Sequence, residues 1–352
     1  MIIPRYILLR ILVPIALAGA LAGCGEKVGK PKESMYVSVP QVTLRDRVAA
    51  LYNKVGMVKA GERVEVLERQ KRFVRVRTGS GQEGWVEQRY LVDQKVFDEF
   101  QKVSRDAASR PAQGRATARK ETNLHIAPGR DSEHIYQLDE GAKVQVLARA
   151  TAEKPGAAAA PAPAKGKNKE GAGEETPQPV LEDFWLVRDA QGHAGWVLSR
   201  MLDLDVPLDI AQYAEGQRIV AYFVLNEVPD GDKKVSQYLV ALTETRDGLP
   251  FDFNQVRVFT WNVKRHRYET AYRERNLFGL LPIATGVEDF GKEGKLPTFS
   301  FRVRDEEGNG AERKYKLNTP IVRRVLAPGE KPVKSMRPAV PKKAPQNSKK
   351  KH

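Results

Sequence analysis

The chain has 352 residues, which at typical domain sizes is enough for two to four compact units. It carries 59 Lys and Arg residues against 44 Asp and Glu residues, and the net charge of +15 favours anionic partners without choosing among lipid, nucleic acid and polysaccharide. A single cysteine excludes an internal disulfide framework, and it also excludes a zinc site built from several thiolates.

The first 24 residues have the pattern of an export signal. They combine two arginines, Arg5 and Arg10, with an apolar run and a series of small residues that ends at the only cysteine. The apolar run covers 11–23 and is shorter than the roughly 20 residues that a spanning helix needs. Residues 1–23 are therefore predicted to be a signal peptide.

The end of this segment, Leu21 to Cys24, resembles the bacterial lipobox. The resemblance implies that the Cys24 thiol is acylated, with palmitate among the chains, and acyl chains contribute ~0.8 kcal/mol per buried CH₂ toward membrane anchoring. The residue after the cysteine is Gly25 rather than aspartate, which in lipoprotein sorting implies the outer membrane, facing the periplasm. Residues 24–34 would form a polar tether. An ordinary signal peptide with a chance cysteine is the alternative.

The chain contains two copies of one unit. Five residues of the first copy recur 80 positions later: Leu44, Gly61, Val64, Val66 and Leu67. Eight more recur 111 positions later: Phe73, Val76, Arg77, Gly81, Gly84, Trp85, Val86 and Leu91. The change of offset, from 80 to 111, predicts an insertion in the second copy. Residues 153–179, rich in Ala, Pro, Gly and Lys, match it and are predicted to be a disordered loop between two strands.

Each copy consists of short segments with the two-residue period of half-buried strands, as at Val64, Glu65 and Val66. The stretches that begin at Lys59 and at Gly84 (KAGERVEVL and GWVEQRYL), with their counterparts in the second copy, resemble the bacterial SH3 (SH3b) domain. The resemblance implies two small antiparallel barrels, over 35–93 and 116–203. Residues 94–115 form a helical linker, because apolar residues recur there at helical spacing, and its helix is predicted to pack against the first barrel.

Aromatic residues of the two copies are the candidate ligand-binding residues: Trp85, Tyr90, Tyr52 and Phe73 in the first, Trp185 and Trp196 in the second. Two interpretations stay open, core packing or the exposed wall of a groove for an extended peptide or glycan. The resemblance implies cell-wall peptides or partner proteins as ligands. A proline-helix ligand is disfavoured, because Glu87 and Leu198 stand where signalling SH3 domains carry proline.

The C-terminal part, 207–326, holds 15 of the 27 aromatic residues and alternates like an antiparallel sheet with one wet face. A sandwich and a single propeller-like blade both fit, and no family resemblance is evident. Residues 327–352, with eight Lys or Arg against one Glu, are predicted to be a disordered tail. This tail is either solubilising or adheres to anionic surfaces.

No catalytic constellation emerges from the sequence. The five histidines show no metal-ligand spacing, the thiol is predicted to be acylated, and Gly286 to Glu293 only approximates a phosphate loop and is predicted to be a plain loop. We therefore expect no catalytic residue, no metal and no cofactor.

These patterns predict a mainly β protein, with two SH3-like barrels, a C-terminal antiparallel β domain, and a disordered linker and tail. Its predicted function is that of a non-enzymatic envelope lipoprotein, anchored in the membrane through Cys24, that contacts peptidoglycan or an envelope protein. The alternative is an accessory or catalytic subunit of an envelope enzyme or assembly machine that the barrels target. Nucleic acid is excluded as a partner by export.

Overall fold

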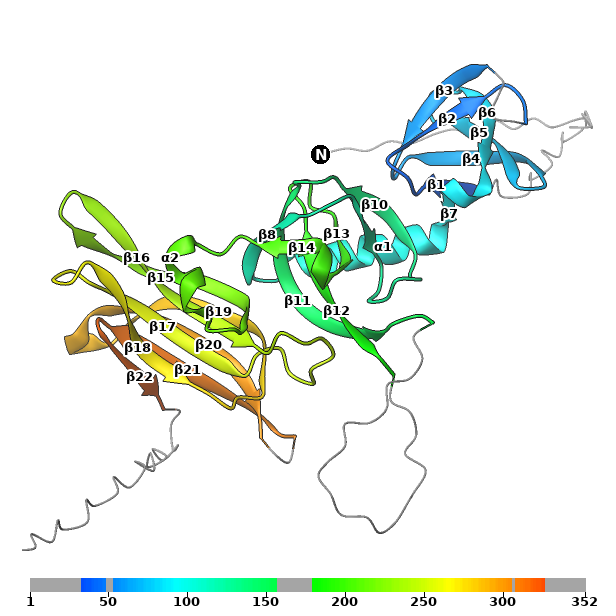
Figure 1. The fold of residues 1–352 in the computed structure, drawn as a ribbon. Helices are drawn as coiled ribbons and strands as arrows, with labels where there is room; N and C mark the ends of the chain where they lie inside the picture. Colours follow the sequence, from blue (N-terminus) through cyan, green and yellow to red (C-terminus); the bar gives the residue numbers. More distant parts are fainter. Residues whose placement is uncertain (1–32, 49–52, 157–178, 306–307, 327–352) are drawn as a thin grey trace, which may run out of the picture. The chain divides into compact units, whose positions relative to one another are not determined.

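The computed structural model describes residues 33–48, 53–156, 179–305 and 308–326. The chain is mainly β, with two seven-stranded and two four-stranded antiparallel sheets (Figure 1). The described residues from Ser34 onward group into one compact unit. The predicted signal peptide, Cys24, Tyr52, the centre of the predicted insertion and the basic tail lie outside the described residues.

The first barrel joins its strands in the order β3-β2-β6-β5-β4-β1-β7. Apolar side chains of alternate strand positions fill its interior, among them Val64, Val74 and Val76, each fully buried. The short helix η1 (Gln88–Tyr90) separates β6 from β7. The strands are β1 (Ser34–Val37), β2 (Gln41–Arg45), β3 (Lys54–Lys59), β4 (Arg63–Gln70), β5 (Phe73–Thr78), β6 (Glu83–Glu87) and β7 (Leu91–Asp93).

The second barrel repeats this order with its own strands, β10-β9-β13-β12-β11-β8-β14. The β11–β12 hairpin is longer than its counterpart, because the two strands stay paired from Gln145 and Arg188 out to Glu153 and Leu181. The predicted insertion follows from this point, and its residues 157–178 are not described. The elements are β8 (Gly114–Ala118), β9 (Thr122–His125), β10 (His134–Leu138), β11 (Lys143–Glu153), β12 (Leu181–Arg188), β13 (Ala194–Leu198), η2 (Ser199–Met201) and β14 (Leu202–Leu204).

The glycine of each repeated Gly-Trp-Val lies where two neighbouring strands approach too closely for a side chain. A Cβ atom on Gly84 would lie 2.7 Å from the Cβ of Leu44, and one on Gly195 would lie 2.7 Å from the Cβ of Leu124. Both leucines are fully buried core residues. Glycine is therefore needed where β6 and β13 cross the strand beside them.

Helix α1 (Gln94–Ala108) follows the first barrel, and Asp93 caps it by accepting a hydrogen bond from the Val96 N–H at 2.9 Å. Its Phe97 ring stacks on Tyr36 of β1 at 3.8 Å between centroids. Its Phe100, fully buried, lies against Tyr136 of β10 at 5.1 Å. The helix thus packs on both barrels, whereas the sequence predicted packing on the first alone.

The outer face of β5 and β6 in the first barrel is polar, whereas the equivalent face of β12 and β13 in the second barrel is apolar and contacts α1. On β5 and β6, Glu83 pairs with Arg75 at 2.9 Å and with Arg77 at 2.7 Å, and all three side chains are partly exposed. At the equivalent positions the second barrel has buried Leu186 and Ala194, which cluster with the C-terminal end of α1. An ion-paired wet face in one copy is an apolar helix-binding face in the other.

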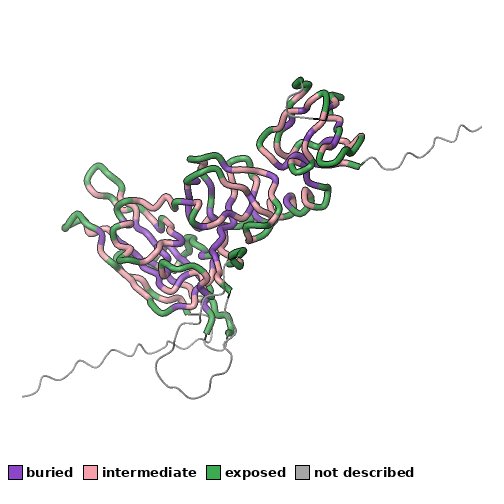
Figure 2. The backbone as a smooth tube through the Cα atoms, turned by 45° about the vertical axis from the view of Figure 1, so that its right-hand side comes forward, coloured by how far each residue is buried: buried purple, intermediate pink, exposed green. Residues whose placement is uncertain are grey.

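The C-terminal domain is a sandwich of two four-stranded sheets, β15-β16-β17-β18 and β19-β20-β21-β22. Val256 and Val258 of one sheet share a core with Phe299, Phe301 and Tyr315 of the other, which excludes the single blade. Figure 2 shows buried residues, in purple, running through this domain. The strands are β15 (Arg218–Asp230), β16 (Lys233–Thr243), β17 (Gln255–Asn262), β18 (Arg267–Glu274), β19 (Gly279–Asp289), β20 (Lys295–Arg304), β21 (Gly310–Asn318) and β22 (Ile321–Val325).

Two further elements of this domain are short. Helix α2 (Leu208–Ala211) and η3 (Gln212–Ala214) pack on the outer face of the first sheet, where Ile210 is fully buried. The stretch from Gly286, predicted to be a plain loop, instead continues β19 as far as Asp289 and then turns through η4 (Gly291–Glu293). The interpretation as a loop was wrong because β19 is exposed here and lacks an alternating apolar pattern.

Buried polar contacts join the second barrel to the sandwich. The Arg149 guanidinium donates to the Asp183 carboxylate at 2.6 Å and to the Phe251 carbonyl oxygen at 2.8 Å. The Gln113 side chain, fully buried, accepts from the Ile283 N–H at 2.7 Å. These bonds satisfy polar groups that the interface removes from water.

Candidate functional site

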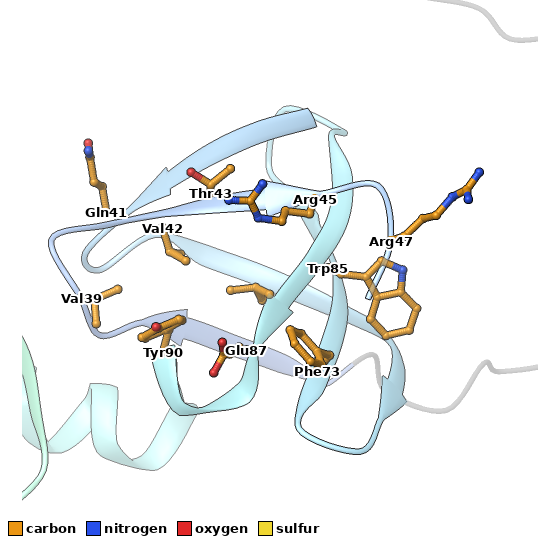
Figure 3. A pocket seen from close by; sticks show the side chains of 11 residues that line it. Val39, Gln41, Val42, Thr43, Arg45, Arg47, Phe73, Trp85, Glu87 and Tyr90 are labelled. Atoms are coloured by element: carbon orange, nitrogen blue, oxygen red, sulfur yellow. The ribbon is translucent and has the colours of Figure 1, made fainter. Parts of the chain in front are cut away.

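A pocket of about 360 Å³ opens on the first barrel between β2, the start of β5, β6 and η1. Figure 3 shows Phe73, Glu87 and Tyr90 along one side and Val42 and Arg45 along the other. The lining residues are Val39, Gln41, Val42, Thr43, Arg45, Arg47, Phe73, Trp85, Val86, Glu87 and Tyr90.

The pleat of β6 decides which way Trp85 faces. Gly84 and Val86 are buried in the barrel core, while Trp85 and Glu87 alternate with them and stay partly exposed. Phe73 and Tyr90 are also half-buried. The first barrel therefore gathers three of the predicted aromatic residues, Trp85, Phe73 and Tyr90, at one pocket, and Trp85 belongs to its wall rather than to the core.

Arginines surround these rings. The Arg72 guanidinium lies over the Phe73 ring at 5.3 Å from its centroid. The Arg89 guanidinium lies over the Tyr90 ring at 4.7 Å and donates to the Tyr90 hydroxyl at 2.6 Å. Arg89 also pairs with the carboxylate of Glu87 at 2.9 Å. The edge of the stacked Arg72 guanidinium is available to a planar anion, whereas Nε and Nη2 of Arg89 are already engaged by Glu87 and Tyr90.

Both the first barrel as a whole and its pocket carry more positive than negative side chains. Residues 35–93 contain 11 Lys or Arg against seven Asp or Glu, and the pocket itself is lined by Arg45, Arg47 and a single carboxylate, Glu87. The lining includes no histidine, no cysteine and no carboxylate pair. The charge balance of this surface favours a ligand with negative charge.

The second barrel uses its equivalent residues for packing. Phe184, at the position of Phe73, is 1% exposed, and Trp185 is 8% exposed in the main core, so Trp185 is not part of an exposed wall. Trp196, at the position of Trp85, is half-buried beside the apolar face that receives α1. Met201 replaces Tyr90.

The buried carboxylates near the sandwich are ion-pair partners. Asp183 and Asp252 both contact the Arg149 guanidinium, at 2.6 and 3.3 Å. Among the described residues no group of three or more His, Cys, Asp and Glu side chains is arranged to hold a metal ion. Within the same residues, no helix has the length and apolarity needed to cross a membrane.

The sequence analysis missed the two arginines that stack on rings of the pocket, Arg72 and Arg89. Their signal was present as two dipeptides, Arg72 before Phe73 and Arg89 before Tyr90, each of which places a cation beside a candidate aromatic residue.

The family comparison matches this barrel. Residues 46–92 fit the model of the bacterial SH3 domain family. The first barrel is a bacterial SH3 domain. The prediction from the sequence is confirmed for the first copy, and the SH3 domain carries the pocket described above. No curated protein matches the chain.

Solved structures with detectable similarity include an NlpC/P60 family protein from Bacillus cereus, at 11% identity and a TM-score of 0.22, covering 55% of this chain and 65% of that one. NlpC2 from Trichomonas vaginalis is similar at 10% identity and a TM-score of 0.17, over 70% of this chain and 98% of its own. NlpC1 from the same organism is similar at 9% identity and a TM-score of 0.17, over 70% and 89%.

Proposed function

We propose that this protein is a non-enzymatic envelope lipoprotein that binds cell-wall peptide through the pocket of its SH3 domain. The observation that carries the proposal is the outward-facing Trp85, which lines the pocket together with Phe73 and Tyr90. Half-buried aromatic rings offer a large apolar contact area at little entropic cost, as extended peptides require. Acylation at Cys24 would hold this pocket at the membrane, facing the periplasm.

The first barrel, rather than the second, is the one suited to binding a ligand, because its aromatic pocket residues remain accessible. The second barrel covers the equivalent face with α1 and buries Phe184. The first barrel leaves its pocket open between β2 and η1. One copy therefore serves recognition, and the other serves assembly of the chain.

Replacing Trp85 by Ala is expected to weaken sedimentation of the full chain with purified peptidoglycan sacculi by about 30-fold, because central aromatic contacts contribute roughly 2 kcal/mol or more. Trp196→Ala is the matched control, since it removes the same side chain at the equivalent register of the second barrel. Circular dichroism checks that both variants fold. Equal loss in both variants, or no loss in Trp85→Ala, contradicts the proposal.

A variant that ends at Leu326 separates pocket binding from adhesion by the basic tail. Binding through the pocket persists in this variant, and at high salt it weakens without disappearing, because salt screens the charged contacts and leaves the apolar ones. Binding that is lost with the tail, or lost completely at high salt, would show charge adhesion instead.

A further inference from the structure

A second cleft, of about 500 Å³, adjoins the pocket on the SH3 domain. It is lined by Arg72, Glu87, Gln88, Arg89 and Leu91, and it shares Glu87 with the first pocket. The two hollows therefore lie on either side of one side chain, at the point where β6 turns into η1. A ligand that crosses Glu87 reaches both.

The charges of this second cleft are unbalanced. Glu87 is neutralised by Arg89, whose Nε lies 2.9 Å from the Glu87 carboxylate. The Arg72 guanidinium rests on the Phe73 ring and has no hydrogen-bond or ion-pair partner within the part of the chain that the structure describes. One cation of the cleft is therefore left without a counter-charge, and the ring beneath it limits the positions that it can adopt.

We propose that the second cleft is a carboxylate subsite, and that the ligand of the SH3 domain is a wall peptide whose carboxylates are free rather than amidated. This inference rests on the proposed function and names its ligand class. Arg72 would bind the carboxylate through its planar fork, and the exposed Arg89, held by Glu87 and Tyr90, would add positive charge beside it. The aromatic pocket on the other side of Glu87 would hold the adjoining part of the peptide.

Charge complementarity selects this ligand over the alternatives. A neutral glycan strand or an amidated peptide would cover the Arg72 guanidinium without supplying a counter-charge, and covering an unpaired charge is unfavourable. A free carboxylate compensates it with charge-assisted hydrogen bonds. The positive balance of residues 35–93 would also favour the approach of an anionic peptide.

The test is calorimetric titration of the full chain, kept in detergent, with muropeptides released from sacculi by a muramidase. One sample is used as released, and the other after its carboxylates have been amidated. We expect amidation to weaken binding about tenfold, and Arg72→Gln to weaken binding of the free peptide about tenfold. Arg72→Gln should bind the amidated peptide as the unmodified chain does, because the interaction is already absent.

The matched control is Arg63→Gln, which removes the same charge from an exposed arginine bonded to Ser34 and outside both hollows. If amidation changes nothing, or if Arg72→Gln behaves like Arg63→Gln, the subsite is overturned. In that case a loss of binding in Trp85→Ala still supports the proposed function. If neither peptide binds the unmodified chain, the proposed function fails, and the subsite fails with it.

Discussion

Replacing Asp183 by Asn is expected to destabilise the folded chain by about 3 kcal/mol, because it leaves a buried arginine without its main counter-charge. Asp183 is fully buried and accepts hydrogen bonds from Arg149 at 2.6 Å, from Arg218 at 2.7 Å and from the Gly248 N–H at 3.0 Å. The Arg149 side chain is itself only 3% exposed. Urea unfolding measures the loss.

Two other carboxylates provide matched controls. Asp252 also contacts Arg149, but burial raises its pKa, and an Asn at this position keeps an acceptor for the Leu281 N–H. Asp252→Asn should therefore cost less than about 1 kcal/mol. Asp203 pairs with Arg119 at the surface, and Asp203→Asn should cost about 0–1 kcal/mol. Equal losses in all three variants would contradict the assignment of Asp183 as the central anion.

The same network predicts an acid-sensitive stability. Burial alone would raise the pKa of Asp183, but the hydrogen bonds of Arg149 and Gly248 and the charges of Arg149 and Arg218 hold that pKa below its ordinary value. A lowered carboxyl pKa contributes stability that is present above the unfolded pKa of about 4 and is lost as pH falls through the folded pKa. As the pH falls from 5 through the folded pKa of Asp183, the free energy of unfolding should therefore decrease less in the Asp183→Asn variant than in the unmodified chain.

Local patterns explain why the barrels could be predicted from sequence. The two-residue period, which depends only on neighbours in the chain, marks the strands and their buried positions, and the repeated Gly-Trp-Val marks the glycine at the close strand approach. The direction of Trp85 was also encoded, because Glu83 and Glu87 share its side of β6 and mark that side as wet. In the second copy Ala194 and Leu198 occupy those positions and mark an apolar face.

Contacts between distant residues explain what was missed. Arg149 and Asp252 are 103 residues apart, and no spacing in the sequence indicates that they meet. Strand β21 carries two lysines and an arginine, and its apolar alternation is limited to Tyr315 and Leu317, whereas β20 alternates over Phe299, Phe301 and Val303. The second sheet of the sandwich consists of β19, β20, β21 and β22. Because the sequence revealed only β20 of these four strands, it could not distinguish a two-sheet sandwich from a single blade.

Replacing Gly279 by Ala is expected to cost about 3 kcal/mol of unfolding free energy, at the upper end of the usual range for overpacking. Gly279 begins β19, and a Cβ atom there would lie 2.1 Å from Cε2 of Phe253. The Phe253 ring is fully buried and meets Phe301 edge to face at 5.6 Å. A close-packed core offers the ring little room to move. Gly286→Ala on the same strand is the control, since its Cβ would meet only Thr298 Oγ1, at 3.6 Å.

A double-mutant cycle identifies the ring as the cause. Phe253→Ala alone should cost about 3–5 kcal/mol, because it leaves a cavity between the sheets. If the Gly279→Ala methyl collides with this ring, the double variant loses clearly less than the sum of the two single losses, because the new methyl then occupies part of the vacated space. Additive losses, or a Gly279→Ala variant as stable as Gly286→Ala, would show that β19 can shift away from Phe253. The sandwich would then be less tightly packed at this strand than the buried Phe253 ring implies.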